Sequence, residues 1–253
     1  MARRATRTAA ALMLLAVMSL VLWAAQGLAA RVRVNAARVA NPVRDDEDDF
    51  RRRVLAAQVA RALARGQERR GNLPADKLAP VGAGHKLRKD AAERFRLLLK
   101  QAESDLRRQQ EAGDPKALKV SDIGVYSAYR SVEEDEAAWH NSFGKHFRET
   151  REARAALRGG AYGDEAVEMM VGIMRKFKAA PGFSYHTSGT AVDFTTTEGG
   201  LCLTANSSRN VRWRKTWLYN WLVNNAARFE FNPLSTEAWH WEYGKRHERR
   251  AGI

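Results

Sequence analysis

The sequence is poor in cysteine, with one in 253 residues. A single thiol cannot form an intramolecular disulfide, and it cannot supply the cysteine cluster of a structural zinc site. Any bound metal must therefore be held by histidine and carboxylate side chains, of which the chain has 6 His and 29 Asp and Glu. The single thiol, Cys202, is expected to be buried and unreactive.

Negative charge is also in short supply. The chain has 43 Lys and Arg against 29 Asp and Glu, a net charge of +14, and such a surplus suits an anionic partner such as nucleic acid, a membrane surface or an acidic polymer. However, residues 1–70 contain 14 arginines, no lysine and six acidic residues, which is more than half of the surplus. The rest of the chain, which carries most of the aromatic residues, is only mildly basic. A nucleic-acid-binding function is therefore not expected.

A long apolar run begins close to the N-terminus. Three arginines precede the run at residues 9–25, and small residues that end at Ala30 follow it. This order is typical of a secretory signal peptide, but the run also approaches the roughly 20 residues that span a bilayer. Residues 1–30 are therefore predicted to be either a cleaved signal peptide or a membrane anchor formed by residues 9–30. Both alternatives predict export to the periplasm or cell envelope, the second with attachment to the inner membrane.

Charge runs and breaker residues divide the remaining chain. Residues 31–77 contain an acidic run at 45–49 and a predicted basic helix at 54–63; we interpret them as a stalk. Prolines and glycines then interrupt the pattern. The main domain is predicted to begin near Leu78 and to comprise residues 78–253.

Apolar spacing in the main domain predicts helices first and strands later. The expected helices are 86–111, 132–147, 164–177 and 215–228, and the expected strands are 120–128, 192–197, 229–231 and 238–243. This order predicts an α+β fold, in which helices flank a small antiparallel sheet.

Three side chains from separate stretches could build a catalytic zinc site. Such a site needs three nitrogen or oxygen ligands and one open position. A Thr-Ser-Gly reversal lies between His186 and Asp193 and can bring both side chains to one ion, and His240 arrives on the last strand. His186, Asp193 and His240 are therefore predicted to bind Zn²⁺.

Two further residues could act beside the metal. Glu237 lies three residues before His240 and would face away from it on a regular strand. We therefore expect Glu237 in the bend after Pro233, turned toward the metal, as the general base for a zinc-activated water. Arg130 would supply a fixed positive charge to the substrate oxygen that gains charge in the transition state.

The order and flanks of these residues resemble a known family. The segment from Ser184 to Asp193 fully meets the pattern Ser-x-His-x-x-Gly-x-Ala-x-Asp, and Glu-x-Trp-His, which ends at His240, closes the domain. Over roughly Leu78 to Tyr243 the chain resembles the zinc D,D-peptidases of the VanY/VanX type, also called LAS peptidases.

The resemblance implies a fold, an activity and a set of site residues. The fold is a small α+β domain with an antiparallel sheet, and the reaction is hydrolysis of peptidoglycan stem peptides, often with release of terminal D-Ala. The implied residues are the zinc ligands His186, Asp193 and His240, the general base Glu237, Arg130 on the scissile carbonyl, and Ser184 in the substrate site.

The chain also departs from the family pattern. Asp135 stands five residues after Arg130, where relatives often have Gln, and an acidic residue there could repel a terminal carboxylate. The interval between Phe231 and Glu237 is short, which suggests a more open cleft suited to polymer-bound peptides. An endopeptidase of L-Ala-D-Glu or cross-link type is therefore an alternative to a D-Ala-D-Ala carboxypeptidase.

A second alternative is a non-catalytic cell-wall-binding protein of the same fold. The acidic run at 133–136 and the basic stalk motivate it, whereas the presence of all five catalytic and metal-binding positions argues against it. The sequence leaves the oligomeric state open.

Overall fold

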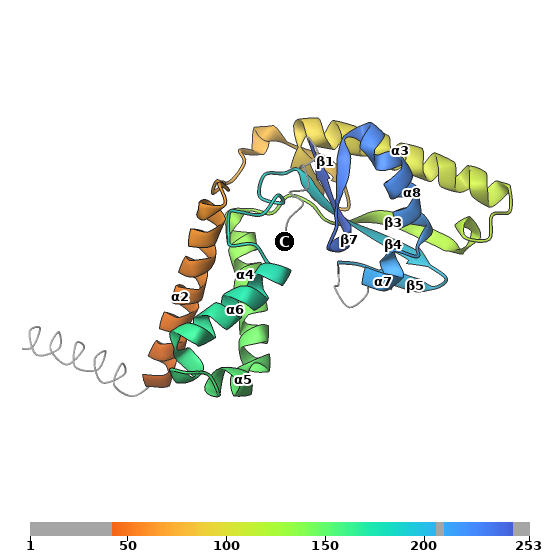
Figure 1. Cartoon of the computed structure of the whole chain (residues 1–253). Coiled ribbons are helices and arrows are strands. Elements are labelled where there is room, and N and C mark those ends of the chain that lie inside the picture. The colour runs from red at the N-terminus through yellow and green to blue at the C-terminus, as the bar shows by residue number, and fades with distance from the viewer. Residues whose placement is uncertain (1–41, 206–209, 245–253) are drawn as a thin grey trace, which may run out of the picture. The chain divides into compact units, whose positions relative to one another are not determined.

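The computed structural model describes residues 42–205 and 210–244 (Figure 1). The predicted signal or anchor segment, residues 1–30, lies outside the described residues. No helix in the described part of the chain is long and apolar enough to cross a bilayer. The described residues divide into two compact units, one made of residues 42–54 and 152–168 and the other of residues 55–151, 169–205 and 210–244.

The smaller unit has a core built around one arginine. It contains the first half of α2 (Pro42–Ala64), most of α5 (Arg151–Ala155), the short helix η3 (Gly160–Tyr162) and the start of α6 (Asp164–Phe177). The guanidinium of Arg154 lies 5.2 Å from the ring centroid of Phe50, and its Nη1 donates a hydrogen bond to the Ala161 carbonyl at 2.6 Å. Because Arg154 is almost fully buried, this cation–π contact and hydrogen bond offset the loss of its hydration.

The larger unit contains a five-stranded antiparallel sheet. Its strands are β3 (Val120–Ser127), β4 (Ala191–Glu198), β5 (Leu201–Leu203), β6 (Phe231–Leu234) and β7 (Glu237–Tyr243). The order is β3-β4-β7-β6, and β5 pairs with β4. A separate antiparallel hairpin joins β1 (Leu78–Gly82) to β2 (His85–Arg88).

Helices complete this unit. They are α3 (Lys89–Glu111), α4 (Val132–Glu149), α7 (Asn210–Trp213) and α8 (Trp217–Asn225), with the second half of α2, the end of α6 and the short helices η1 (Ala75–Lys77), η2 (Ala117–Lys119) and η5 (Ala226–Phe229). Figure 1 shows α3, α8 and the sheet of β3, β4 and β7 together. The predicted α+β fold with a small antiparallel sheet is confirmed.

Aromatic side chains join α3 to the sheet. Phe95 of α3 lies 5.6 Å from Phe194 of β4 and 6.0 Å from Phe231 of β6, measured between ring centroids. All three side chains are fully buried, and each contributes about 1.5–3 kcal/mol by leaving water. In addition, the indole of Trp221 on α8 donates a hydrogen bond to Asp105 on α3 at 2.9 Å. These contacts fix α3 against the sheet that carries the candidate site.

Several predicted elements need correction. The helix predicted from residue 86 begins at Lys89 because residues 85–88 form β2. The strand predicted over 229–231 begins later, because β6 starts at Phe231 and continues through Asn232 and Pro233 to Leu234. Within the described residues β6 is an edge strand that pairs with β7 alone, and edge strands are where proline is tolerated in a sheet.

The expectation that Cys202 is buried is also wrong, because the residue is exposed. Cys202 is the middle residue of β5, and its neighbours Leu201 and Leu203 pack into the core. Successive side chains of a strand point to opposite faces. Packing of the two leucines against the core therefore turns the thiol outward.

Candidate active site

Strand register places two of the predicted ligands opposite each other. Asp193 of β4 and His240 of β7 are direct partners in the antiparallel ladder. Directly opposite residues project from the same face of a sheet. The two side chains therefore meet by the construction of the sheet.

A tight reversal before β4 brings in His186. The Thr187 N–H donates to the Ser184 carbonyl at 3.1 Å, and the Gly189 N–H donates to the His186 carbonyl at 3.0 Å. Gly189 has a φ of +66°, and a Cβ there would lie 2.9 Å from the backbone nitrogen of Arg88. Only glycine fits this backbone without strain, so the reversal depends on it.

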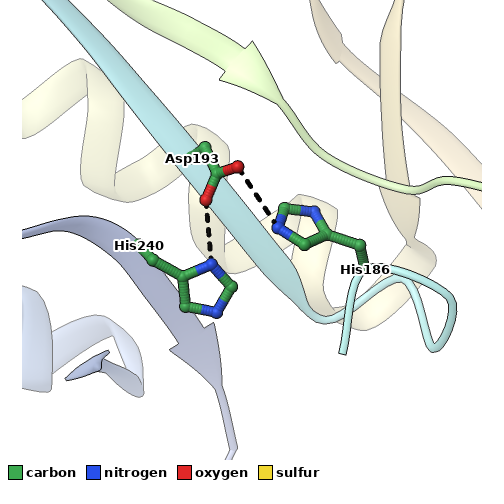
Figure 2. Close-up of side chains that lie close together, drawn as sticks. All are labelled: His186, Asp193 and His240. Carbon is green, nitrogen blue, oxygen red and sulfur yellow. Dashed lines mark hydrogen bonds and ion pairs between the residues drawn. The ribbon is translucent and has the colours of Figure 1, made fainter. Parts of the chain in front are cut away.

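Figure 2 shows the Asp193 carboxylate between the two imidazoles. Its Oδ2 lies 3.3 Å from His186 Nε2, and its Oδ1 lies 2.8 Å from His240 Nδ1. One candidate ligand atom from each residue lies within 4.8 Å of the other two, and all three residues are buried. The structure thus brings together the three side chains that the sequence predicts as ligands.

In each imidazole, the ring nitrogen that does not face Asp193 has a hydrogen-bond partner of its own. His186 Nδ1 lies 2.6 Å from the Ala128 carbonyl oxygen, and His240 Nε2 lies 3.1 Å from Glu242 Oε1. A carbonyl oxygen only accepts hydrogen bonds, so His186 carries its proton on Nδ1. The Nε2 lone pair of His186 then faces the carboxylate, as in metal sites whose ligands are oriented by outer partners.

Burial and charge act in opposite directions on this cluster. Burial lowers the pKa of His186 and favours its neutral form. Burial alone would raise the pKa of Asp193, but the neighbouring His186 and His240 hold it far below its usual range. Burial also opposes the charge of His240, yet its hydrogen bonds to Asp193 and Glu242 prevail and raise its pKa to about 10. The Asp193 carboxylate thus stays ionised between the two imidazoles.

The donor set fits Zn²⁺. A neutral Nε2 and a carboxylate oxygen 3.3 Å apart present two acceptors to each other, an arrangement that is unfavourable unless a cation lies between them. Two imidazoles and one carboxylate are a common ligand set of catalytic zinc.

Glu237 interacts electrostatically with His240 and Asp193, although it does not lie in the predicted bend. It is the first residue of β7 and follows a two-residue turn after β6. The strand register shifts between Pro233 and Leu234, so the pairing at this end of the hairpin is irregular. The Oε2 of Glu237 accepts a hydrogen bond from the Trp239 indole at 3.1 Å. Burial raises the pKa of Glu237. The charge of His240 opposes this shift, and the charge of Asp193 adds to it.

Arg130 connects two of the predicted segments. Its backbone N–H donates to the His186 carbonyl at 3.3 Å, and its Nη1 donates to Ser127 Oγ at 3.1 Å. Its Nη2 lies 3.4 Å from Oδ1 of Asp135, which is almost fully buried. The other Asp135 oxygen accepts from the Gly182 N–H at 3.4 Å. Asp135 therefore bonds both to Arg130 and to the segment that leads to His186.

Ser184 has a local role in the reversal. Its Oγ accepts a hydrogen bond from the His186 N–H at 3.2 Å, and the residue is half-buried. Side-chain oxygens of serine commonly cap a turn in this way.

Sequence reasoning missed the connector, residues 65–74, which follows α2. The Arg70 N–H donates to the Gly182 carbonyl at 2.7 Å, and the Leu73 N–H donates to the Tyr129 hydroxyl at 3.1 Å. Asn72 Oδ1 accepts from the Val132 N–H at 2.6 Å. The connector thus bonds to both loops that carry site residues, and only its glycine and asparagine content marks it in the sequence.

The connector gives a first testable prediction. Asn72→Ala removes the bond to Val132 and another, at 2.8 Å, from its Nδ2 to Glu133. Each bond contributes about 0.5–1.5 kcal/mol, so urea denaturation should show a loss of about 1–3 kcal/mol in unfolding free energy. Gln67→Ala, at an exposed position of the same connector, is the matched control and should change little.

Equal stability of the two variants would contradict the importance of the connector. The domain start near Leu78 stays a prediction. The hydrogen bonds of the connector favour a start upstream of it.

One family model matches most of the larger unit's sequence. The chain matches the family model of VanY, D-alanyl-D-alanine carboxypeptidase, over residues 84–246. No curated protein sequence matches the chain.

Solved structures with a similar fold include three peptidases. A zinc complex of a variant of the vancomycin-resistance D,D-pentapeptidase VanY, from a VanB-type cassette, has 21% identity and a TM-score of 0.43, with 70% of this chain and 85% of that chain covered. VanYB in complex with D-alanine-D-alanine has 20% identity and a TM-score of 0.42, covering 68% and 81%. The LD-carboxypeptidase LdcB has 18% identity and a TM-score of 0.42, covering 68% and 70%.

The matched region, residues 84–246, contains the buried His186–Asp193–His240 cluster together with Glu237 and Arg130. The chain therefore belongs to the VanY family of D-alanyl-D-alanine carboxypeptidases.

Proposed function

We propose that this chain is a zinc peptidase that hydrolyses peptidoglycan stem peptides as a D-Ala-D-Ala carboxypeptidase. The observation that carries the proposal is the inward Nε2 of His186, which faces the Asp193 carboxylate at 3.3 Å while its Nδ1–H is donated to Ala128. A metal ion between these two atoms would bind both of them. His186, Asp193 and His240 would hold the zinc.

The other side chains then have distinct roles. When bound, zinc acts as a Lewis acid and lowers the pKa of a water ligand to about 7. Glu237 accepts the proton of the attacking water and passes it to the leaving amine. Burial raises the pKa of Glu237, which makes its carboxylate a stronger proton acceptor than an exposed one.

Arg130 supplies the positive charge. Ser127 and Asp135 fix its guanidinium, so the charge is oriented before the substrate arrives. A preorganised donor of this kind stabilises an oxygen that becomes negative in the transition state. Ser184 would line the substrate site beside it.

The family supports the proposed substrate class, and the N-terminal segment supports the proposed location. The family is described as D-alanyl-D-alanine carboxypeptidases, and VanYB has been solved with D-alanine-D-alanine bound. Peptidoglycan stem peptides lie outside the cytoplasm. Residues 1–30, as a signal peptide or anchor, would deliver the enzyme to the periplasm or envelope.

Mass spectrometry of purified muropeptides tests this proposal. With zinc present, pentapeptide stems that end in D-Ala-D-Ala should lose the mass of one alanine residue. A chelator should abolish the loss, and added zinc should restore it. Cleavage at L-Ala-D-Glu or at a cross-link would instead assign an endopeptidase, and full survival of all stems in zinc would contradict a peptidase function.

A further inference from the structure

The two imidazoles of the candidate site differ in their outer partners. His186 Nδ1 lies against the neutral carbonyl of Ala128, whereas His240 Nε2 lies 3.1 Å from Oε1 of the Glu242 carboxylate. The Glu242 side chain is only 15% exposed. A mostly buried carboxylate costs free energy unless it is hydrogen-bonded, and the ring N–H of His240 supplies such a bond. The contact is therefore favourable for both side chains.

The sheet fixes the position of Glu242. His240 and Glu242 are two residues apart on β7, so both side chains leave the same face of the sheet. Glu242 pairs with Ala191 of β4 on one side and with Asn232 of β6 on the other. Because neighbouring strands hold its backbone on both sides, the Glu242 side chain starts from a rigid base beside the His240 ring.

The orientation of the His240 ring decides which atom it offers to a metal. Its Nδ1 lies 2.8 Å from Asp193 Oδ1, while its Nε2 faces Glu242. A half-turn of the ring about its bond to Cβ would put carbon atoms in place of both nitrogens, and carbon cannot coordinate the ion. A carboxylate only accepts hydrogen bonds, so Glu242 favours the ring orientation and the tautomer in which the proton is on Nε2 and Nδ1 keeps its lone pair.

We propose that Glu242 is a positioning residue of the zinc site, which accepts the Nε2–H of His240 and thereby holds the Nδ1 lone pair toward the ion. This inference rests on the proposed function. Histidines that bind a metal commonly donate their other ring N–H to a carboxylate or a carbonyl, and loss of that partner typically weakens metal binding by about 10–100-fold. Glu242 acts through His240, so its effect should appear in zinc affinity even without a substrate.

A second substitution separates positioning from a plain effect of charge. A negative charge near the site would attract a divalent cation even without a hydrogen bond to His240. Glu242→Met removes both the charge and the acceptor at a similar side-chain length. Glu242→Gln also removes the charge, but its amide oxygen can still accept the Nε2–H of His240. Positioning therefore predicts that only Glu242→Met is strongly impaired, whereas a charge effect predicts an equal loss in both variants.

Zinc affinity of the full chain, measured by competition with a chromogenic chelator, tests the inference. Glu242→Met should bind zinc about 10–100-fold more weakly than wild type. Glu242→Gln should stay within about threefold of wild type, because it keeps the hydrogen bond to His240. Glu93→Met is the matched control, since Glu93 is exposed on α3, and it should bind zinc as wild type does.

Unchanged affinity in Glu242→Met, or an equal loss in both Glu242 variants, would overturn the inference. Nitrogen-15 NMR of the zinc-loaded wild type gives a second readout that needs no variant. A proton on Nε2 of His240 and none on Nδ1 supports the inference, and a proton on Nδ1 overturns it. Should Glu242→Met fail to fold by circular dichroism, Glu242→Ala takes its place.

Muropeptide hydrolysis by the same proteins separates failure of this inference from failure of the proposed function. If wild type binds zinc but cleaves no stem peptide, the peptidase function is wrong, and the zinc affinities of the variants still decide the role of Glu242. If wild type cleaves stems and Glu242→Met binds zinc normally, the function stands and the inference is overturned. A wild type that binds no zinc would contradict both.

Discussion

Glu237→Gln is expected to leave zinc bound and to lower kcat by about 10²–10⁴-fold, the usual contribution of a positioned general base. Glutamine has nearly the same shape and can still accept the hydrogen bond from the Trp239 indole. It cannot take up a proton, however. The loss should therefore fall on kcat, with little change in KM or in zinc content measured by atomic emission.

Glu230→Gln is the matched control for this experiment. Glu230 lies just before β6 and forms an exposed ion pair with Arg94 at 3.1 Å, which contributes little to stability. Its replacement should leave both zinc content and turnover unchanged. If Glu237→Gln kept more than about a tenth of wild-type kcat, Glu237 would not be the base.

His186→Ala is expected to abolish both zinc binding and activity. The substitution removes one of the three proposed ligands, all of them buried, and leaves Asp193 and His240 as an incomplete set. Loss of a partner that only orients a ligand typically weakens metal binding by 10–100-fold, so loss of the ligand itself should weaken it by more than about 100-fold. Competition with a chromogenic zinc chelator measures this affinity.

His85→Ala is a suitable control, because His85 belongs to β2 and lies outside the cluster. It should bind zinc as wild type does. Zinc affinity of wild-type strength in His186→Ala would show that the ion is held elsewhere.

Local sequence patterns predicted the elements that carry the site. The helix over 132–147 is α4, where Ser131 and Glu134 form a capping box, and the strands over 192–197 and 238–243 are β4 and β7. These segments combine strong periodicity with clear start signals. Once they pair antiparallel, the meeting of Asp193 and His240 follows from their register.

Contacts between distant parts of the chain were not predictable in the same way. The bonds from Arg70, Asn72 and Leu73 to the site loops join residues about 60 to 110 positions apart, and no local pattern encodes such a pairing. The short strand β5 is likewise defined by its pairing with β4 rather than by propensity.

The role of Asp135 illustrates the same limit of local patterns. In the sequence it is one of four consecutive acidic residues at the start of a helix, which are usually solvated. In the structure it is buried between Arg130 and Gly182. Its function depends on a loop that arrives 47 residues later, so the sequence alone suggested only its charge.

Anomalous X-ray scattering at the zinc edge, from crystals of the full chain grown with zinc, tests the central claim most directly. The account predicts one peak, about 2.0–2.2 Å from His186 Nε2, an Asp193 oxygen and His240 Nδ1. A map without a peak between these atoms, or with its peak at other histidines, would contradict it.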